Sequence, residues 1–165
     1  MEEVEGVMID NEVLLGVLLH QRENRIDDSV YKMVQCDFAY NSNHMEGSRL
    51  TSEQTRMVFG RKEISGEGIP LDDILEAMNH FEAFDTILDR SGDPLDADLL
   101  RSLHGTLKAG TTQARNPLYS VGDYKKYENV VGALDLSTTP PEKVEAEMEA
   151  LLRGYERTGK HDLDD

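Results

Sequence analysis

The sequence predicts an all-α domain that carries one short β excursion. Apolar residues recur at three- and four-residue spacing along most of the chain, which is the periodicity of amphipathic helices. Glycine, proline and capping residues interrupt this pattern at intervals and divide it into about six helical segments. One stretch near residue 125 loses the helical period and is rich in tyrosine and valine, which favour strands.

The first half of the chain is expected to form four helices. Two are predicted over about Asn11 to Glu23 and Asp28 to Tyr40. The third opens with Thr51 and Gln54, which have the spacing of a capping box, and ends near Gly60. Pro70 introduces the fourth, whose predicted apolar stripe is Leu71, Ile74, Leu75, Met78, Phe81, Phe84 and Leu88.

The second half is expected to contain two helices separated by the β excursion. A helix from about Leu95 to Ala109 should stop at Gly110. A short hairpin, or an ordered flap, is predicted near Tyr124 to Val131, between Gly122 and Gly132. Thr139 and Glu142 then have capping-box spacing around two prolines, and the last helix should bury a stripe made of Val144, Met148, Leu151, Leu152 and Tyr155.

The charge balance argues against a nucleic-acid partner. The 165 residues include 33 acidic and 17 basic side chains, a net charge of −16, and the basic residues are scattered among acids. Phosphate backbones are bound by clustered lysine and arginine, so direct nucleic-acid contact is not expected. The acidity fits solubility, or a basic surface on a protein partner.

The sequence also gives no indication of a membrane or an oxidising compartment. A membrane helix needs about 18 to 20 apolar residues, and the most apolar stretch, Val13 to Leu19, is much shorter and contains Gly16. The single Cys36 cannot form an internal disulfide. We therefore expect a cytoplasmic protein with no membrane contact.

No catalytic or metal-binding constellation is visible in the sequence. It has no phosphate-binding glycine loop, no zinc-binding histidine pair and no thiol pair. The five histidines, His20, His44, His80, His104 and His161, are far apart, so ordinary surface or core histidines are expected.

The most informative segment surrounds Ser42, Glu46 and Gly47. On a helix, Ser42 and Glu46 lie four residues apart, so that a hydroxyl and a carboxylate share one face. Gly47 then allows a sharp turn. Spacing alone favours a simple interpretation, in which a helix ends with a surface glutamate.

The order of several motifs resembles that of Fic-domain proteins that carry their own inhibitor near the N-terminus. The Ser-x-x-x-Glu-Gly motif at residues 42 to 47 is similar to the inhibitory-helix motif of these proteins. Gly122-Asp123-Tyr124-Lys125 is similar to the family's Gly-x-Tyr-Arg, with Lys125 where arginine is commoner. The remaining matches are Leu50-Thr51, Ala77-Met78-Asn79, Leu103-His104 and Pro140-Pro141, so that the similarity runs from about Phe38 to Tyr155.

The resemblance implies a Fic-like helical bundle with a short β-hairpin flap. It divides the chain into an N-terminal helical segment (1–37), an inhibitory helix region (38–60) and an incomplete Fic-type helical core (61–165). The family's signature, close to His-Pro-Phe-x-Asp/Glu-Gly-Asn-Gly-Arg-x-x-Arg, is absent, because none of the five histidines precedes a proline. We therefore expect a chain truncated before its catalytic loop.

The resemblance further implies transfer of AMP from ATP to a hydroxyl of a target protein, with Mg²⁺, in the intact enzyme. It makes Glu46 the inhibitory carboxylate, Ser42 its helper and Gly47 the turn residue. The flap that holds the target contains Gly122, Tyr124, Lys125, Tyr127, Val130 and Val131. The resemblance names no catalytic residue or metal ligand within this chain. The fragment is expected to be inactive and to bind neither ATP nor Mg²⁺ tightly.

A different class of function stays open. The same residues fit a non-enzymatic acidic helical module that binds a partner protein, in which the tyrosines near residue 125 would be interface residues. Self-association into a homo-oligomer is compatible with either interpretation.

Overall fold

The described residues of a computed structural model of the chain (10–61, 67–131 and 136–158) form a helical bundle. Two 3₁₀ turns, Gln113–Arg115 and Pro117–Tyr119, follow the fifth helix. Strands β1 (Val130–Val131) and β2 (Leu136–Ser137) precede the last helix. The helices are α1 (Asn11–Glu23), α2 (Val30–Met45), α3 (Ser52–Arg61), α4 (Leu71–Asp89), α5 (Ala97–Leu107) and α6 (Pro141–Thr158). The predicted all-α class is confirmed.

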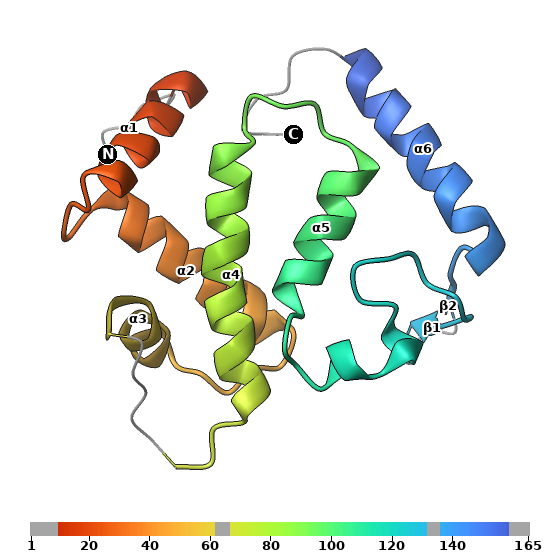
Figure 1. Ribbon diagram of the computed structural model, residues 1–165, viewed down its shortest axis with the longest axis horizontal. Coiled ribbons are helices and arrows are strands. Elements are labelled where there is room, and N and C mark those ends of the chain that lie inside the picture. The colour runs from red at the N-terminus through yellow and green to blue at the C-terminus, as the bar shows by residue number, and fades with distance from the viewer. Residues whose placement is uncertain (1–9, 62–66, 132–135, 159–165) are drawn as a thin grey trace, which may run out of the picture.

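Helix α4 is the centre of the bundle. It packs against α2, α3 and α5, while α1 packs on α2 and α6 packs on α5 (Figure 1). Because neighbours surround it on several sides, its buried positions do not form one stripe; they include Ala77, Ala83 and Leu88. The predicted stripe is wrong at two positions, since Leu71 is 63% exposed and Met78 is 41% exposed.

The apolar core joins the N-terminal helices to the end of α4. Leu18, Tyr31 and Leu88 form its buried cluster. Phe59 and Phe84 pack against this cluster, and Phe59 also meets Phe81 edge-on, with 4.8 Å between ring centres. Edge-to-face contacts of this kind add to the stabilisation that burial alone provides.

The local signals at helix ends are borne out most clearly at α3. The Gln54 N–H donates to Oγ1 of Thr51 at 3.2 Å, and the Thr51 N–H donates to Oε1 of Gln54 at 2.9 Å. The predicted capping box is therefore present with both of its bonds. The side chains of Asp10, Ser29 and Asp96 cap α1, α2 and α5 in the same manner, by accepting a backbone N–H of the first turn.

Helix α2 is longer than the sequence predicts. It continues to Met45 instead of ending at Tyr40, and it runs through the predicted segment boundary after residue 37. Asn41, Ser42 and Asn43 are poor helix formers, which is why the pattern indicated an earlier end. Ala39 and Asn43 are buried in the packed bundle, and tertiary packing outweighs these weak local preferences.

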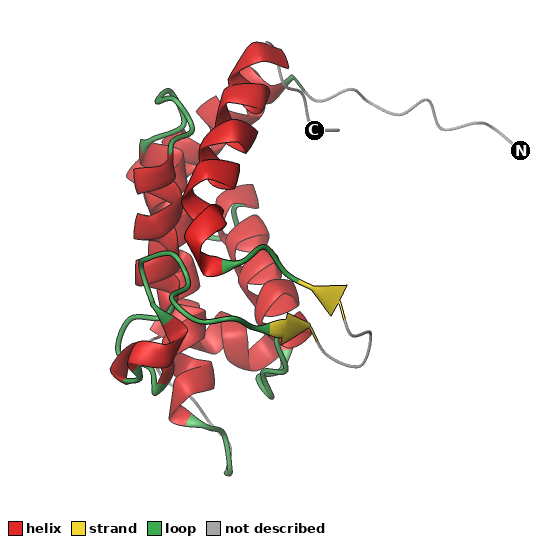
Figure 2. Cartoon of the chain, turned by 90° about the vertical axis from the view of Figure 1, so that its right-hand side faces the viewer, coloured by secondary structure: helices red, strands yellow, loops and turns green. Residues whose placement is uncertain are grey.

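The β excursion is smaller and lies later than predicted. Residues 124–129 are not strand; only Val130 and Val131 pair, antiparallel, with Ser137 and Leu136. Figure 2 shows this strand pair at the edge of the molecule, outside the packed helices. Of the preceding residues, Tyr124 contacts Arg101 of α5, and Lys125 is hydrogen-bonded to Asn129. The predicted end of the flap at Gly132 lies outside the described residues.

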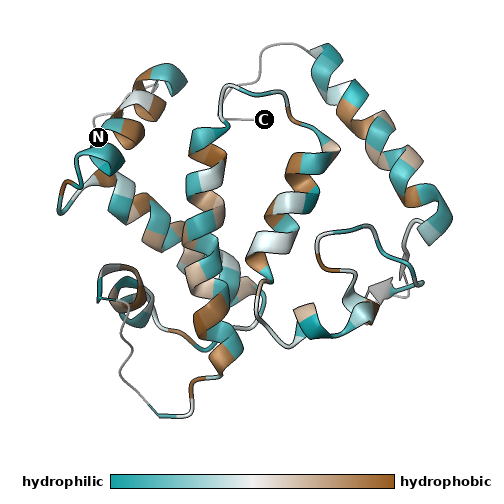
Figure 3. Ribbon diagram, in the orientation of Figure 1, coloured by the Kyte–Doolittle hydropathy of each residue, from teal (hydrophilic) through white to brown (hydrophobic). Residues whose placement is uncertain are grey.

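Helix α6 departs from its predicted packing. None of the side chains described in α6 is fully buried. Val144, Met148 and Leu152 of the predicted stripe are partly buried, so the stripe is wrong only at Leu151 and Tyr155. Leu151 is 66% exposed and Tyr155 is 41% exposed, and the helix mixes hydrophilic and hydrophobic residues along its length (Figure 3). No helix among the described residues is both long enough and apolar enough to cross a membrane.

Candidate functional site

The end of α2 is a tight, fully bonded turn. The Gly47 N–H donates to the carbonyl of His44 at 3.0 Å, and the Ser48 N–H donates to the carbonyl of Asn43 at 2.9 Å. These two bonds form a Schellman motif, which requires a left-handed residue just after the helix. Gly47 fills that position with φ +94°. The predicted turn residue is therefore where the chain turns.

Ser42 and Glu46 lie one helical turn apart at this end of α2. The Glu46 N–H donates to the carbonyl of Ser42 at 3.3 Å, so the helical pattern continues to Glu46. Both residues line an open pocket of about 340 Å³. Its other walls come from α4 and α5 and from neighbouring residues of α2, namely Asn43, Met45, Glu76, His80, Leu107 and Lys108. The structure thus brings Ser42 and Glu46 to one pocket.

An ion pair forms the wall opposite α2. Nζ of Lys108 lies 2.8 Å from Oε1 of Glu76, and their side chains are only 20% and 16% exposed. Burial, and then the charge of Lys108, lowers the pKa of His80, so this imidazole is neutral at neutral pH. Lys108 is therefore the cationic side chain that lines this pocket, and it is paired with Glu76.

Asn43, which lines the same pocket, carries an unpaired buried donor. This residue is 5% exposed, and its Nδ2 has no hydrogen-bond partner among the described residues. Leaving a buried amide unpaired costs about 1 to 3 kcal/mol, so Asn43 is held at this cost beside the pocket. The sequence pattern missed Asn43, Glu76, His80 and Lys108, because they meet only when α2, α4 and α5 pack. Only Asn43 had a local signal, its place beside Ser42.

The predicted flap begins against α5. The Gly122 N–H donates to Nδ1 of His104 at 3.3 Å, and a Cβ at Gly122 would lie 3.5 Å from Cα of Gly105. The guanidinium of Arg101 lies 5.3 Å from the ring centre of Tyr124, a contact that a cation and an aromatic face stabilise. The start of the flap is therefore fixed to the helix that also lines the pocket.

The other predicted flap residues lie farther along. Lys125 is partly buried and is hydrogen-bonded to Asn129 within the flap and to Thr138 beyond it. Tyr127 is 55% exposed, and Val130 and Val131 form β1. The pocket is lined by Leu107 and Lys108 at the C-terminal end of α5, one to two turns from the helix residues that hold the flap. One helix thus carries both predicted regions.

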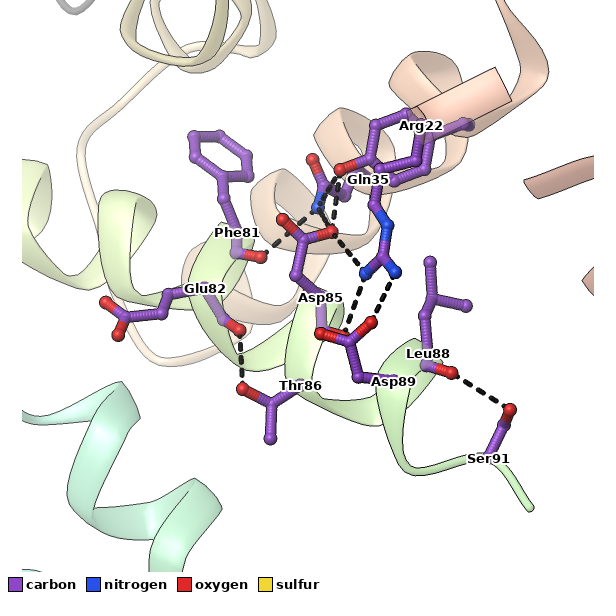
Figure 4. A network of polar contacts seen from close by, with 10 residues as sticks. Arg22, Gln35, Phe81, Glu82, Asp85, Thr86, Leu88, Asp89 and Ser91 are labelled. Carbon is purple, nitrogen blue, oxygen red and sulfur yellow. Dashed lines mark hydrogen bonds and ion pairs between the residues drawn. The ribbon is translucent and has the colours of Figure 1, made fainter. Parts of the chain in front are cut away.

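A polar network fixes the N-terminal half of α2 to α4 (Figure 4). Nε2 of Gln35 lies 3.2 Å from the carbonyl of Phe81 and 3.1 Å from Oδ1 of Asp85. Arg22 of α1 donates to the Asp85 carbonyl at 3.2 Å and forms an ion pair with Asp89. These contacts tie α1 and α2 to the same two turns of α4, and so set the direction in which α2 leads to the pocket.

The described residues offer no metal site. No group of three or more histidine, cysteine, aspartate or glutamate side chains in this part of the chain is placed to hold a metal ion.

No protein-family model matches the sequence, and no curated protein matches it. Among solved structures, a Fic domain containing signaling protein from Bacteroides thetaiotaomicron superposes on 87% of this chain, with a TM-score of 0.65 and 26% sequence identity. The match covers 56% of that protein's chain, so this chain spans little more than half of its length. The chain therefore has a Fic-like helical fold.

Proposed function

We propose that this chain is the N-terminal portion of an autoinhibited protein adenylyltransferase of the Fic family. The complete cytoplasmic enzyme would transfer AMP from ATP to a hydroxyl of a target protein. The chain of 165 residues would be inactive by itself, because the phosphate-binding signature loop is not in its sequence. The similarity to a Fic domain containing signaling protein supports this proposal.

One observation carries the regulatory part of the proposal. Ser42 and Glu46 lie one turn apart on α2 and line the same open pocket, directly before the turn at Gly47. A carboxylate held at the edge of an open pocket is well suited to accept two hydrogen bonds from a guanidinium group. In the proposal, the Glu46 carboxylate forms an ion pair with an arginine of the signature loop, and this arginine would otherwise bind the γ-phosphate of ATP.

The remaining residues have supporting roles in this scheme. Ser42 assists Glu46 from the same helical face, and Gly47 lets the chain leave the pocket. The segment from Gly122 to Gly132 holds an extended part of the target protein by backbone pairing, as an added strand does. The signature loop, beyond this chain, supplies the base, the metal ligand and the phosphate site.

The test measures AMP transfer from labelled ATP by the protein extended past Asp165. Glu46 is exposed in this chain, and in the proposal the signature loop of the extended protein covers it. Replacing Glu46 with glycine should therefore raise the rate, including self-modification, by at least roughly tenfold, because it removes a carboxylate–arginine pair that would be buried in the extended protein. Glu53→Gly on the exposed start of α3 is the control and should leave the rate unchanged. The 165-residue chain itself should transfer no AMP.

The outcomes separate the two classes of function. A Glu46→Gly enzyme no faster than its parent would remove the inhibitory role of α2. A reading frame that continues past Asp165 without the Fic signature would instead favour the acidic helical module that binds a partner protein. The gene sequence downstream of Asp165 is therefore the first observation to make.

A further inference from the structure

Lys125 closes the base of the strand pair. Its Nζ lies 2.6 Å from Oδ1 of Asn129 and 2.5 Å from Oγ1 of Thr138. The Thr138 hydroxyl in turn lies 2.9 Å from the carbonyl and 2.7 Å from Oδ1 of Asn129, and can donate its hydrogen to either. One ammonium group thus joins the residue before β1 to the residue after β2. We call these three residues the flap clasp.

The clasp continues the ladder of the two strands. Val130 pairs with Ser137 in the antiparallel register, so Asn129 and Thr138 are the next pair outward. Side chains, not a regular backbone rung, make this pair. An isolated two-stranded hairpin is marginally stable in water, and here each strand has two residues. The formation of the strand pair therefore depends on the contacts at its base.

Lys125 also connects the strand pair to the helices. It follows Tyr124, which lies against Arg101 of α5, and Gly122, whose N–H is bonded to His104. The neighbouring Lys126 points elsewhere, with Nζ 3.1 Å from Asp123, and is exposed. Of the two adjacent lysines, Lys125 is therefore the one that links the start of the flap, which is held against α5, to β1 and β2.

We propose that Lys125 is a positioning residue, which clasps Asn129 and Thr138 and thereby holds the strand pair in the conformation that accepts an extended target segment. The target-binding part of this inference rests on the proposed adenylyltransferase function, whereas the clasp itself does not. An ammonium has three donors, and an arginine could serve the same two acceptors with its planar fork.

The first experiment uses the 165-residue chain and tests the clasp alone. Amide hydrogen exchange and cross-strand NMR contacts of Val131 and Leu136 are compared in Lys125→Met, Lys125→Arg and Lys126→Met. Lys125→Met should lose the cross-strand contacts, while the amides of α4 keep their protection from exchange. Lys125→Arg and Lys126→Met should keep the cross-strand contacts. Cross-strand contacts that survive in Lys125→Met would overturn the proposal.

The second experiment tests target binding in the extended protein that also carries Glu46→Gly. The substrate is a pool of random extended peptides, each with one serine, threonine or tyrosine. Lys125→Met should lower kcat/KM for the peptide pool at least about fivefold, through a higher KM for the peptides, while KM for ATP stays unchanged. Lys125→Arg should retain the kcat/KM of the parent. The matched control is Lys143→Met, at an exposed lysine in the first turn of α6, outside the flap.

The two experiments fail in distinguishable ways. If Lys125→Met leaves AMP transfer to the peptides unchanged, the role of Lys125 in target binding is wrong. An enzyme that labels itself but none of the peptides would also contradict this role, because backbone pairing tolerates many sequences and some peptides of the pool should bind. A Glu46→Gly protein that labels neither itself nor peptides would instead contradict the proposed function. The hydrogen-exchange result would then still decide whether the clasp exists.

Discussion

The phenol oxygen of Tyr31 lies 2.6 Å from Oδ1 of Asp85, and this hydrogen bond joins α2 to α4 across 54 residues of sequence. Tyr31 is 7% exposed, so water cannot readily replace the bond. Gln35 binds both groups, with Nε2 3.1 Å from each oxygen. The orientation of α2, and with it the position of Ser42 and Glu46, depends on this buried contact.

The first prediction is that Tyr31→Phe destabilises the chain by about 1.5 to 3 kcal/mol, the usual range for a hydrogen bond to a charged group. The phenylalanine ring keeps the apolar contacts, so the change isolates the hydroxyl. Urea denaturation measures the free energy of unfolding. Tyr127→Phe is the control, because Tyr127 is 55% exposed and should change stability by less than about 0.5 kcal/mol. Equal stability of the two variants would show that the Tyr31 bond contributes nothing.

The second prediction concerns high pH. Burial, followed by the hydrogen bond to Asp85, raises the pKa of Tyr31 well above its ordinary value of 10.0. The unfolded chain therefore loses the phenol proton at a lower pH than the folded chain does. As a result, the contribution of Tyr31 to the free energy of unfolding falls as the pH rises above about 10. The stability difference between the parent and Tyr31→Phe should shrink between about pH 9 and 11. A difference that grows over this range would contradict the assigned cause.

Helix boundaries were predicted well where the interaction that ends or begins the helix involves only neighbouring residues. The Thr51 and Gln54 side chains bond to backbone groups three residues away, so four residues of sequence contain the whole interaction. The turn at Gly47 is similar, because a left-handed residue is required next to the helix it ends. Ser42 and Glu46 could be placed on one face for the same reason.

The features that sequence reasoning missed depend on contacts between distant segments. The extension of α2 to Met45 follows from burial of Ala39 and Asn43, which no propensity reports. The pairing of Glu76 with Lys108, which forms the far wall of the pocket, joins residues 32 positions apart on different helices. The strand pair starts at Val130 instead of Tyr124, and the intervening segment includes Tyr124, which contacts Arg101 of α5, and Lys125, which binds Asn129. Neither contact has a signal in the local sequence.

The third prediction compares two glycines that have free space around them. Gly47→Ala should cost about 1 kcal/mol, because an alanine side chain is disfavoured at φ +94° although nothing lies within 4 Å of the added Cβ. Gly16→Ala, within α1 and equally free of contacts, should instead stabilise the chain by about 0.5 to 1 kcal/mol. Urea denaturation of both variants provides the check. Two changes of the same sign would contradict the left-handed turn after α2.

The last prediction separates the charge of Glu46 from its place at the end of α2. Glu46 is the C-terminal capping residue, and Glu46→Gly would create two adjacent glycines there, so activation by that variant could reflect a loosened helix end. Glu46→Gln keeps the length of the side chain and the backbone preference but removes the charge, which is the part that a guanidinium group recognises most strongly. If the proposed inhibition is a carboxylate–arginine pair, Glu46→Gln in the extended protein should raise AMP transfer from labelled ATP by several-fold.

The stability of the 165-residue chain should change by less than about 0.5 kcal/mol in Glu46→Gln, because Glu46 is exposed. Ser42→Ala on the same face should give a smaller increase. Activation by Glu46→Gly but not by Glu46→Gln would show that the end of α2, and not the Glu46 charge, restrains the enzyme.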